Sequence, residues 1–365
     1  MSRKNKREKP VERRVKKLLR LIGDKTDGVL ITSAENVRYL SGFTGSEGIL
    51  LVTHSQSFFF TDGRYTTQAR QQVQGFSLQC FRDKWKDIGS IIKKLGIRTL
   101  GFESRHLTVA MLGDIEKQIS HLALKLFGAE LDGLRLIKDS GEIALLRKAA
   151  RIAHNALQEV LPLIVPGVSE HDIATELEYR MKQHGAQGPA FPTIVASGVR
   201  SALPHGTATE KKICAGELLT IDYGVQYQGY CSDETCTFVV GKPTRRQKRV
   251  YETVLRAHDR ALQMVAPNID LKKIDAAARS LIARHGFQRY FNHGTGHGVG
   301  LCVHEPPVVS ARATMTARRG MVFTIEPGVY IPGWGGVRIE DMVLVTARVY
   351  EVLTCHTKKL HCLAV

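Results

Sequence analysis

Residues 292–305 read Asn292-His293-Gly294-Thr295-Gly296-His297-Gly298-Val299-Gly300-Leu301-Cys302-Val303-His304-Glu305. Three histidines fall within twelve residues, and glycine occupies every second position from Gly294 to Gly300. Because side chains alternate between the faces of an extended strand, His293 and His297 share one face and the other is bare backbone. Bare backbone lowers stability but allows another group to approach closely. The segment is therefore either one wall of a functional site or a glycine-rich bend with structural histidines.

Carboxylates occur in two predicted β-hairpins. In the first, residues 218–233, two strand-like runs meet at a turn near Tyr227-Gln228, which would place Asp222 opposite Asp233. Like charges in opposed positions destabilise a hairpin, and a polyvalent cation would turn this repulsion into a binding site. In the second, strands at 321–326 and 337–341 flank a loop centred on Gly333, which would place Glu326 opposite Glu340.

Four carboxylates and one imidazole favour Mn²⁺, Fe²⁺, Co²⁺ or Zn²⁺ as the bound metal. Calcium would prefer an all-oxygen set of ligands in a loop of its own. Five ligands exceed what one catalytic ion with an open position needs. They fit two ions about 3.5–4 Å apart, bridged by carboxylates and by a hydroxide nucleophile.

Length and composition are those of an ordinary globular protein. The chain has 365 residues, and this length suggests two domains. Its residues are 43% hydrophobic and 24% charged, as in an ordinary globular protein. No apolar run approaches the ~20 residues of a membrane span, so we expect no membrane association. The seven cysteines are scattered and odd in number, unlike a disulfide framework, and the expected location is the reducing cytoplasm.

The net charge of +17 is concentrated at the N-terminus, where ten Lys and Arg residues lie within the first twenty positions. A nucleic-acid-binding arm is one interpretation of this basic tail. A solvated tail that leads into a basic helix is the interpretation we favour, because no aromatic residue lies among these bases to stack on nucleotides.

The chain order predicts an α+β protein. The basic tail covers residues 1–14, and a smaller α/β domain with alternating strands and helices covers 15–137. A polar break at 137–142 marks the domain boundary, and in the second domain, residues 138–365, helices are expected to cover an antiparallel sheet. Helical spacing of apolar residues predicts four helices, near 142–163, 170–184, 244–265 and 270–285.

Other patterns carry little weight. Cys355-His356 and His361-Cys362 form a cysteine and histidine cluster whose spacing fits no common zinc finger. His304-Glu305 begins like a zinc-binding helix, but Pro306-Pro307 forbids a helix there. The chain has no Gly-x-Ser-x-Gly elbow, so a serine hydrolase lacks support.

Taken together, these residues make the second domain resemble the pita-bread metallopeptidases, a group that includes aminopeptidase P, prolidase, methionine aminopeptidase and creatinase. The region 25–135 is similar to the creatinase-type N-terminal domain. Residues 39–48 look most like Xaa-Pro peptidases. The resemblance rests on 191–198, 293–305, Ala202-Leu203-Pro204-His205-Gly206, Ile221-Asp222-Tyr223-Gly224, Tyr230-Cys231-Ser232-Asp233, Thr324-Ile325-Glu326-Pro327-Gly328 and Gly336-Val337-Arg338-Ile339-Glu340-Asp341.

The resemblance implies a set of site residues. The implied metal ligands are Asp222, Asp233, His297, Glu326 and Glu340. Asp233 and Glu340 would bridge two divalent ions, with Mn²⁺ expected and Co²⁺ or Zn²⁺ as alternatives. The residues implied to act on the substrate or the carboxylate layer are His205, His293, His304, Glu326 and Arg338. The alternating glycines would then give clearance to metals and to a peptide backbone.

The activity implied is that of a metallo-exopeptidase, an Xaa-Pro aminopeptidase, in which a metal-bridging hydroxide attacks the scissile carbonyl. Its substrates are peptides with proline at the second position, and the family suggests a homodimer or a larger homo-oligomer. Two alternatives stay open: an Xaa-Pro dipeptidase (prolidase), and a non-catalytic, nucleic-acid-associated protein on the same fold. One departure is Cys236, where many relatives carry arginine. This residue is not a ligand, so the departure concerns local charge pairing.

Overall fold

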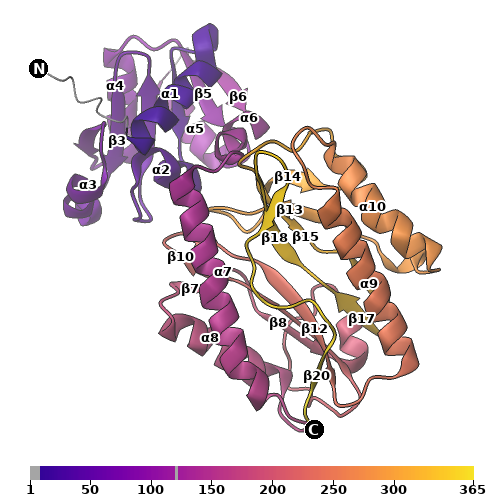
Figure 1. Ribbon diagram of the computed structural model, residues 1–365. Helices are drawn as coiled ribbons and strands as arrows, with labels where there is room; N and C mark the ends of the chain where they lie inside the picture. The colour runs from indigo at the N-terminus through magenta and orange to yellow at the C-terminus, as the bar shows by residue number, and fades with distance from the viewer. Residues whose placement is uncertain (1–8, 120–121) are drawn as a thin grey trace, which may run out of the picture. The chain divides into compact units, whose positions relative to one another are not determined.

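The computed structural model describes residues 9–119 and 122–365, which divide into two compact units at Arg135 and Leu136 (Figure 1). Residues 1–8 of the predicted basic tail lie outside the described residues. The first helix begins at Pro10, so the last part of the expected tail is helical. None of the described helices is both long and apolar enough to cross a bilayer.

The first unit is an α/β unit around one mixed sheet. The sheet has the order β4-β3-β2-β1-β5-β6, with β1, β2 and β3 antiparallel and the other pairs parallel. Its helices are α1 (Pro10–Ile22), η1 (Gly23–Lys25), α2 (Ala34–Ser41), η2 (Gly63–Tyr65), α3 (Thr66–Gln72), α4 (Lys84–Lys94), α5 (Val109–Gln118), α6 (Ala129–Asp132) and η3 (Gly133–Arg135). Its strands are β1 (Gly28–Ile31), β2 (Ile49–Thr53), β3 (Ser57–Thr61), β4 (Ser77–Cys80), β5 (Thr99–Glu103) and β6 (Ala123–Phe127).

The second unit contains the four predicted long helices. They are α7 (Ser140–Val160), α8 (Glu170–Gln183), α9 (Arg245–Gln263) and α10 (Leu271–Arg284), joined by η4 (Leu161–Leu163), η5 (Gly198–Ala202) and η6 (Gln288–Tyr290). A capping box starts α7: the Asp139 carboxylate accepts from the backbone of Glu142, and the Glu142 carboxylate accepts from the backbone of Asp139. These four helix predictions are confirmed to within two or three residues.

The strands of the second unit form several small sheets. They are β7 (Gly188–Pro189), β8 (Ile194–Ser197), β9 (Leu218–Tyr223), β10 (Val225–Tyr227), β11 (Tyr230–Cys231), β12 (Glu234–Val240), β13 (Gly296–Gly298), β14 (Glu305–Val309), β15 (Val322–Ile325), β16 (Gly328–Ile331), β17 (Gly335–Arg338), β18 (Asp341–Val345), β19 (Tyr350–Val352) and β20 (His361–Leu363). The two larger sheets have the orders β20-β12-β9-β8 and β14-β13-β15-β18-β19.

Each larger sheet has its own helical cover (Figure 1). Apolar residues of α7 and α8 pack with β8, β9 and β12 in one buried cluster. Those of α9 and α10 pack with β15, β17 and β18 in a second cluster. The pairing within both sheets is antiparallel except between β12 and β20. The predicted α+β class, with helices that cover antiparallel sheet, is confirmed.

The predicted register of the first hairpin is wrong by two residues. Asp222 pairs with Thr235, and Tyr227 pairs with Tyr230. The turn is formed by Gln228 and Gly229, both at positive φ, as two-residue hairpin turns of the primed types require. The turn therefore lies one residue later than expected. A shift of two preserves the face, so Asp222 and Asp233 still point to the same side.

The predicted register of the second hairpin is correct. Gly328 pairs with Arg338 in β16 and β17, and Ile325 pairs with Asp341 in β15 and β18. Both pairs follow one register, which sets Glu326 opposite Glu340. The two carboxylates lie where the β15–β18 pairing passes into the β16–β17 hairpin.

Candidate metal centre

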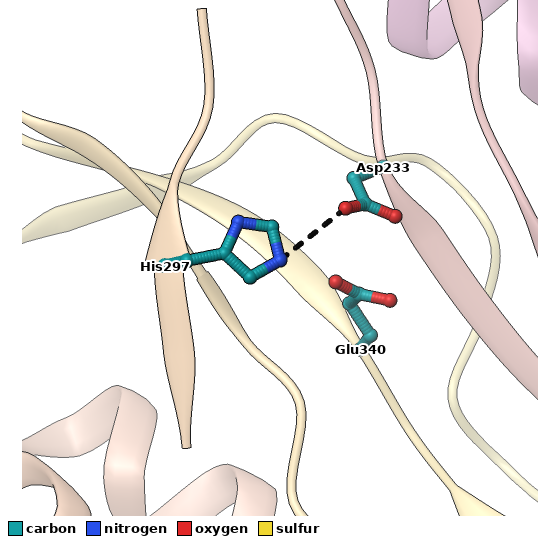
Figure 2. Close-up of side chains that lie close together, drawn as sticks. All are labelled: Asp233, His297 and Glu340. Atoms are coloured by element: carbon teal, nitrogen blue, oxygen red, sulfur yellow. Dashed lines mark ion pairs between the residues drawn. The ribbon is translucent and has the colours of Figure 1, made fainter. Parts of the chain in front are cut away.

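Three side chains that are distant in sequence converge in the second unit. His297 lies in the middle of β13, Asp233 directly precedes β12, and Glu340 directly precedes β18. Figure 2 shows the imidazole facing the two carboxylates. One ligand atom from each of the three lies within 4.8 Å of the others, and Nε2 of His297 is 3.5 Å from Oδ2 of Asp233. This spacing is suited to a shared cation.

The two other expected ligands lie beside this cluster. Oε1 of Glu326 is 3.3 Å from Nε2 of His297. Asp222, near the end of β9, lines the same cavity. Its Oδ1 atom is buried and has no hydrogen-bond partner among the described residues. A buried carboxylate oxygen without a donor is costly, so this atom is placed as a metal ligand would be.

The tautomer of His297 also fits metal binding. Nδ1 lies 3.2 Å from the carbonyl oxygen of Gly298, which can only accept. Nδ1 therefore carries the proton and donates, which leaves the lone pair of Nε2 directed at the carboxylates. Burial lowers the pKa of the imidazole, so the ring is neutral at physiological pH.

The carboxylates repel one another strongly. Burial, and then the charges of Glu340 and Asp222, raise the pKa of Asp233 well above its usual range. Burial, and then the charge of Glu326, raises the pKa of Glu340 well above its usual range. Arg338 is the single Lys or Arg among the described residues that line the cavity. One guanidinium cannot balance four carboxylates, and divalent cations would supply the missing charge.

Arg338 is held at four points. It donates to Oδ2 of Asp222 at 2.6 Å, to Oγ1 of Thr235 at 2.9 Å, to the carbonyl oxygen of Pro204 at 2.9 Å and to the hydroxyl of Tyr330 at 3.0 Å. This confinement fixes the orientation of Asp222, which leaves its other oxygen free to face the cavity.

Two residues of this layer were missed in the sequence. Thr235 Oγ1 donates to Oε2 of Glu340 at 2.6 Å, and it shares a strand face with Asp233, so the period of two could have found it. The Tyr330 hydroxyl lies 3.0 Å from Nε2 of His293. Tyr330 pairs with Gly336 across the second hairpin, and the predicted register placed it near the site without indicating its role.

The three histidines expected beside the ligands also line the cavity, but they differ in their contacts. Both ring nitrogens of His293 are engaged, since Nδ1 lies 2.7 Å from the carbonyl oxygen of Gly294 and Nε2 faces Tyr330. His205 and His304 are exposed. The ring of His304 lies 4.1 Å, centroid to centroid, from that of His297. These two imidazoles are the ones placed to meet a ligand.

The loop that carries His205 is fixed by Glu170, at the start of α8, whose side chain is fully buried. The Glu170 carboxylate accepts from the backbone and hydroxyl of Ser197, from Nε of Arg200, and from the backbone and hydroxyl of Thr209. These partners bracket the loop on both sides. A charged hub with five donors is a rigid support for one wall of the site.

Two of the alternating glycines allow neighbouring backbone to approach closely. A Cβ atom at Gly296 would lie 1.8 Å from the carbonyl oxygen of Thr324, and one at Gly298 would lie 2.2 Å from that of Pro306. The close approach is therefore made by the neighbouring strands of the sheet. Gly296 also lines the cavity, and the expected clearance for metals and a peptide backbone stays a prediction.

The cavity itself has a volume of about 420 Å³. Its polar floor is the carboxylate and histidine cluster. Its apolar lining comes from Phe191, Pro192, Ile194, Pro204, Val303 and Val308. A small cavity with an apolar wall and convergent polar groups is typical of a binding site for a compact organic ligand.

Comparison with known proteins identifies both parts of the chain. Residues 144–347 match the model of metallopeptidase family M24. Residues 14–137 match the creatinase/prolidase N-terminal domain. The chain is 42% identical to the uncharacterized peptidase YqhT of Bacillus subtilis, over 95% of this chain and 99% of the relative. It is 41% identical to an Xaa-Pro dipeptidase of Pyrococcus horikoshii, over 93% and 96%.

Solved structures resemble both units. An Xaa-Pro dipeptidase from Bacillus anthracis superposes with a TM-score of 0.95 at 39% identity, over 97% of this chain and all of that one. An X-Pro aminopeptidase from Thermotoga maritima gives a TM-score of 0.90 at 34% identity, over 96% and 99%. The expected pita-bread architecture behind a creatinase-type N-terminal domain is thereby confirmed.

Proposed function

The chain belongs to metallopeptidase family M24 and is a metallo-exopeptidase, and on this premise we propose that it is an Xaa-Pro dipeptidase. The carrying observation is end-to-end similarity to proteins named Xaa-Pro dipeptidases, in sequence and in structure. This favours the dipeptidase alternative over the Xaa-Pro aminopeptidase that we expected from the sequence.

Membership of the family implies divalent metal ions, and we propose that two of them bind here. The donors would be the five residues around the cavity floor, Asp222, Asp233, His297, Glu326 and Glu340, with Asp233 and Glu340 shared between the ions. Four carboxylates against one guanidinium leave a large negative excess, which supports two divalent ions over one. Mn²⁺ is the proposed metal, with Co²⁺ or Zn²⁺ as alternatives, because the donors combine oxygen with one nitrogen.

When bound, such ions act as Lewis acids and lower the pKa of water to near neutrality. The chain's own residues would do the rest. The exposed imidazoles of His205 and His304 would donate to the carbonyl oxygen as negative charge develops on it. His293, fixed by Tyr330, would shape the same wall. The Glu326 carboxyl would carry a proton towards the leaving nitrogen.

The apolar wall supports proline as the second residue of the substrate. A proline ring presents hydrocarbon and its amide nitrogen bears no hydrogen, so a site for an Xaa-Pro bond needs apolar surface and no acceptor for that N–H. Phe191, Pro192 and Val308 would provide such surface.

An Xaa-Pro aminopeptidase that acts on longer peptides is the second candidate. It is supported by the likeness to the Thermotoga maritima structure over nearly the whole chain. The two candidates differ in whether the substrate must end at proline.

Cleavage of Ala-Pro beside Ala-Pro-Ala, with Ala-Ala as the control for proline dependence, tests the proposal. Metal-depleted protein should be inactive, and Mn²⁺ should restore cleavage of Ala-Pro while Ala-Pro-Ala and Ala-Ala stay intact. Faster cleavage of Ala-Pro-Ala would establish the aminopeptidase instead. Full activity in the presence of a chelator would refute both.

A further inference from the structure

Three of the proposed metal ligands are each followed by a residue that points to the opposite face of the strand. Asp222, Asp233 and Glu340 face the cavity, and the next residues are Tyr223, Glu234 and Asp341. Alternation along a strand sends these three side chains behind the site. All three are buried there, and two of them are acidic.

Lys358 joins the two acidic residues. Its Nζ atom lies 2.5 Å from Oε1 of Glu234 and 3.3 Å from Oδ1 of Asp341. Its side chain is 9% exposed, against 1% for Glu234 and 6% for Asp341. The other oxygen of Glu234 accepts from the Tyr223 hydroxyl at 2.8 Å. One ammonium thus binds two carboxylates that are covalently next to proposed ligands.

The segment around Lys358 is itself anchored. The backbone N–H of His356 donates to Oε1 of Glu234 at 3.1 Å, and the Tyr251 hydroxyl of α9 donates to the carbonyl oxygen of Lys358 at 3.0 Å. On the far side of Asp341, Nε2 of His258 lies 3.1 Å from Oδ2. The ammonium is therefore held in place independently of the cavity.

The Lys358 ammonium offsets the repulsion between two buried carboxylates. Without it, the buried carboxylates of Glu234 and Asp341 would repel each other in a medium of low polarity. Each is one residue from a proposed ligand, so any separation of the pair changes the spacing between Asp233 and Glu340. These two are the carboxylates that must approach closely to share ions.

We propose that Lys358 is a positioning residue, which ties Glu234 to Asp341 and thereby sets the distance between Asp233 and Glu340. The inference rests on the proposed function of those two as metal ligands. It also accounts for Cys236, whose Sγ atom lies 3.6 Å from Nζ of Lys358. Many relatives carry arginine at position 236. Here Lys358 supplies a positive charge at the same place, from elsewhere in the chain.

The test compares Lys358→Met with Lys359→Met, its exposed neighbour. Mn²⁺ binding to metal-depleted protein is measured by calorimetry, with circular dichroism as the check on folding. Loss of a residue that hydrogen-bonds a metal ligand typically weakens affinity 10–100-fold. Lys358 acts one residue further out, through Glu234 and Asp341, so we expect the lower end of that range, about 10-fold, for Lys358→Met and no loss for Lys359→Met. With Ala-Pro as substrate, Lys358→Met should change kcat by a larger factor than it changes KM.

A relocated charge gives the decisive comparison. The double variant Cys236→Lys/Lys358→Met places an ammonium within reach of the same carboxylates and should recover most of the Mn²⁺ affinity. Glu234→Gln keeps the size and shape of the side chain but removes its negative charge. This variant replaces Lys358→Met as the test if Lys358→Met does not fold. We expect a weaker loss of Mn²⁺ affinity from Glu234→Gln.

Wild-type Mn²⁺ affinity in folded Lys358→Met, or in Glu234→Gln if the first does not fold, would overturn the proposal. So would a lost affinity that the relocated lysine does not restore. Failure of the proposed function has a different signature: wild-type protein would bind Mn²⁺ yet leave Ala-Pro intact, and the comparison of Mn²⁺ affinities would still stand.

Discussion

Replacing Lys138 by methionine should strongly destabilise the second unit. Nζ of Lys138 lies 2.8 Å from Oε1 of Glu305, and the two side chains are 1% and 2% exposed. Removing one partner of a buried pair costs about 3–5 kcal/mol, because the remaining charge keeps its desolvation penalty. For a domain of about 150–250 residues each kcal/mol lowers Tm by about 2–4 °C, so the expected fall is roughly 6–20 °C.

The assay is thermal unfolding followed by circular dichroism, supported by urea titration of the free energy of unfolding. Lys182→Met, on the exposed surface of α8, is the matched control and should stay within about 0.5 kcal/mol of wild type. The double variant Lys138→Met/Glu305→Gln removes both charges and should regain more than half of the loss. A Lys138→Met protein as stable as the control, or a double variant no better than the single one, would refute the reasoning.

Three further predictions concern the site, a glycine and a surface carboxylate. Arg338→Met should lower kcat/KM for Ala-Pro by about 10–100-fold and weaken Mn²⁺ binding, because Asp222 loses its 2.6 Å partner; unchanged kinetics would contradict the role given to Arg338. Gly296→Ala should lower the free energy of unfolding, measured by urea titration, by about 1–3 kcal/mol or more, because the new Cβ atom meets the Thr324 carbonyl oxygen. Gly113→Ala is the control and should not lower it, because the space around Gly113 is open. Backbone N–H groups of Thr99 and Arg98 hold the pKa of Asp27 below its usual range, so its contribution to stability is present above about pH 4 and is lost as the pH falls through the folded-state pKa. Asp27→Ala should therefore cost at most about 1 kcal/mol at pH 7, given its exposure, and progressively less as the pH falls through the folded-state pKa of Asp27. A cost that does not change with pH would argue against the hydrogen bonds.

Local patterns predicted much of the second unit. Helix spacing located four helices, and the register of the second hairpin set Glu326 opposite Glu340. The first hairpin was misplaced because both Gln228 and Gly229 take positive φ, and only the glycine signals that from sequence. A primed turn beginning at a glutamine gives no clear sequence signal.

Long-range contacts explain most of what the sequence could not predict. The nine residues named from it line one cavity, although their roles stay proposals. Tyr330, Thr235 and Lys358 were missed because their importance comes from partners on other strands. The cysteine and histidine cluster at 355–362 was set aside on ligand spacing, yet the lysine within it contacts the residues behind the site.

The parallel pairing of β20 with β12, close to Lys358, bears on the order in which the protein matures during synthesis. The first unit can fold while the ribosome is still translating the second, because domains generally fold as units. All five candidate ligands have been synthesised once residue 340 is added, but the lysine behind two of them follows later. A nascent or prematurely terminated chain therefore carries a complete set of donors without their spacer. On our proposal a chain that ends before this lysine binds Mn²⁺ more weakly than the full chain does.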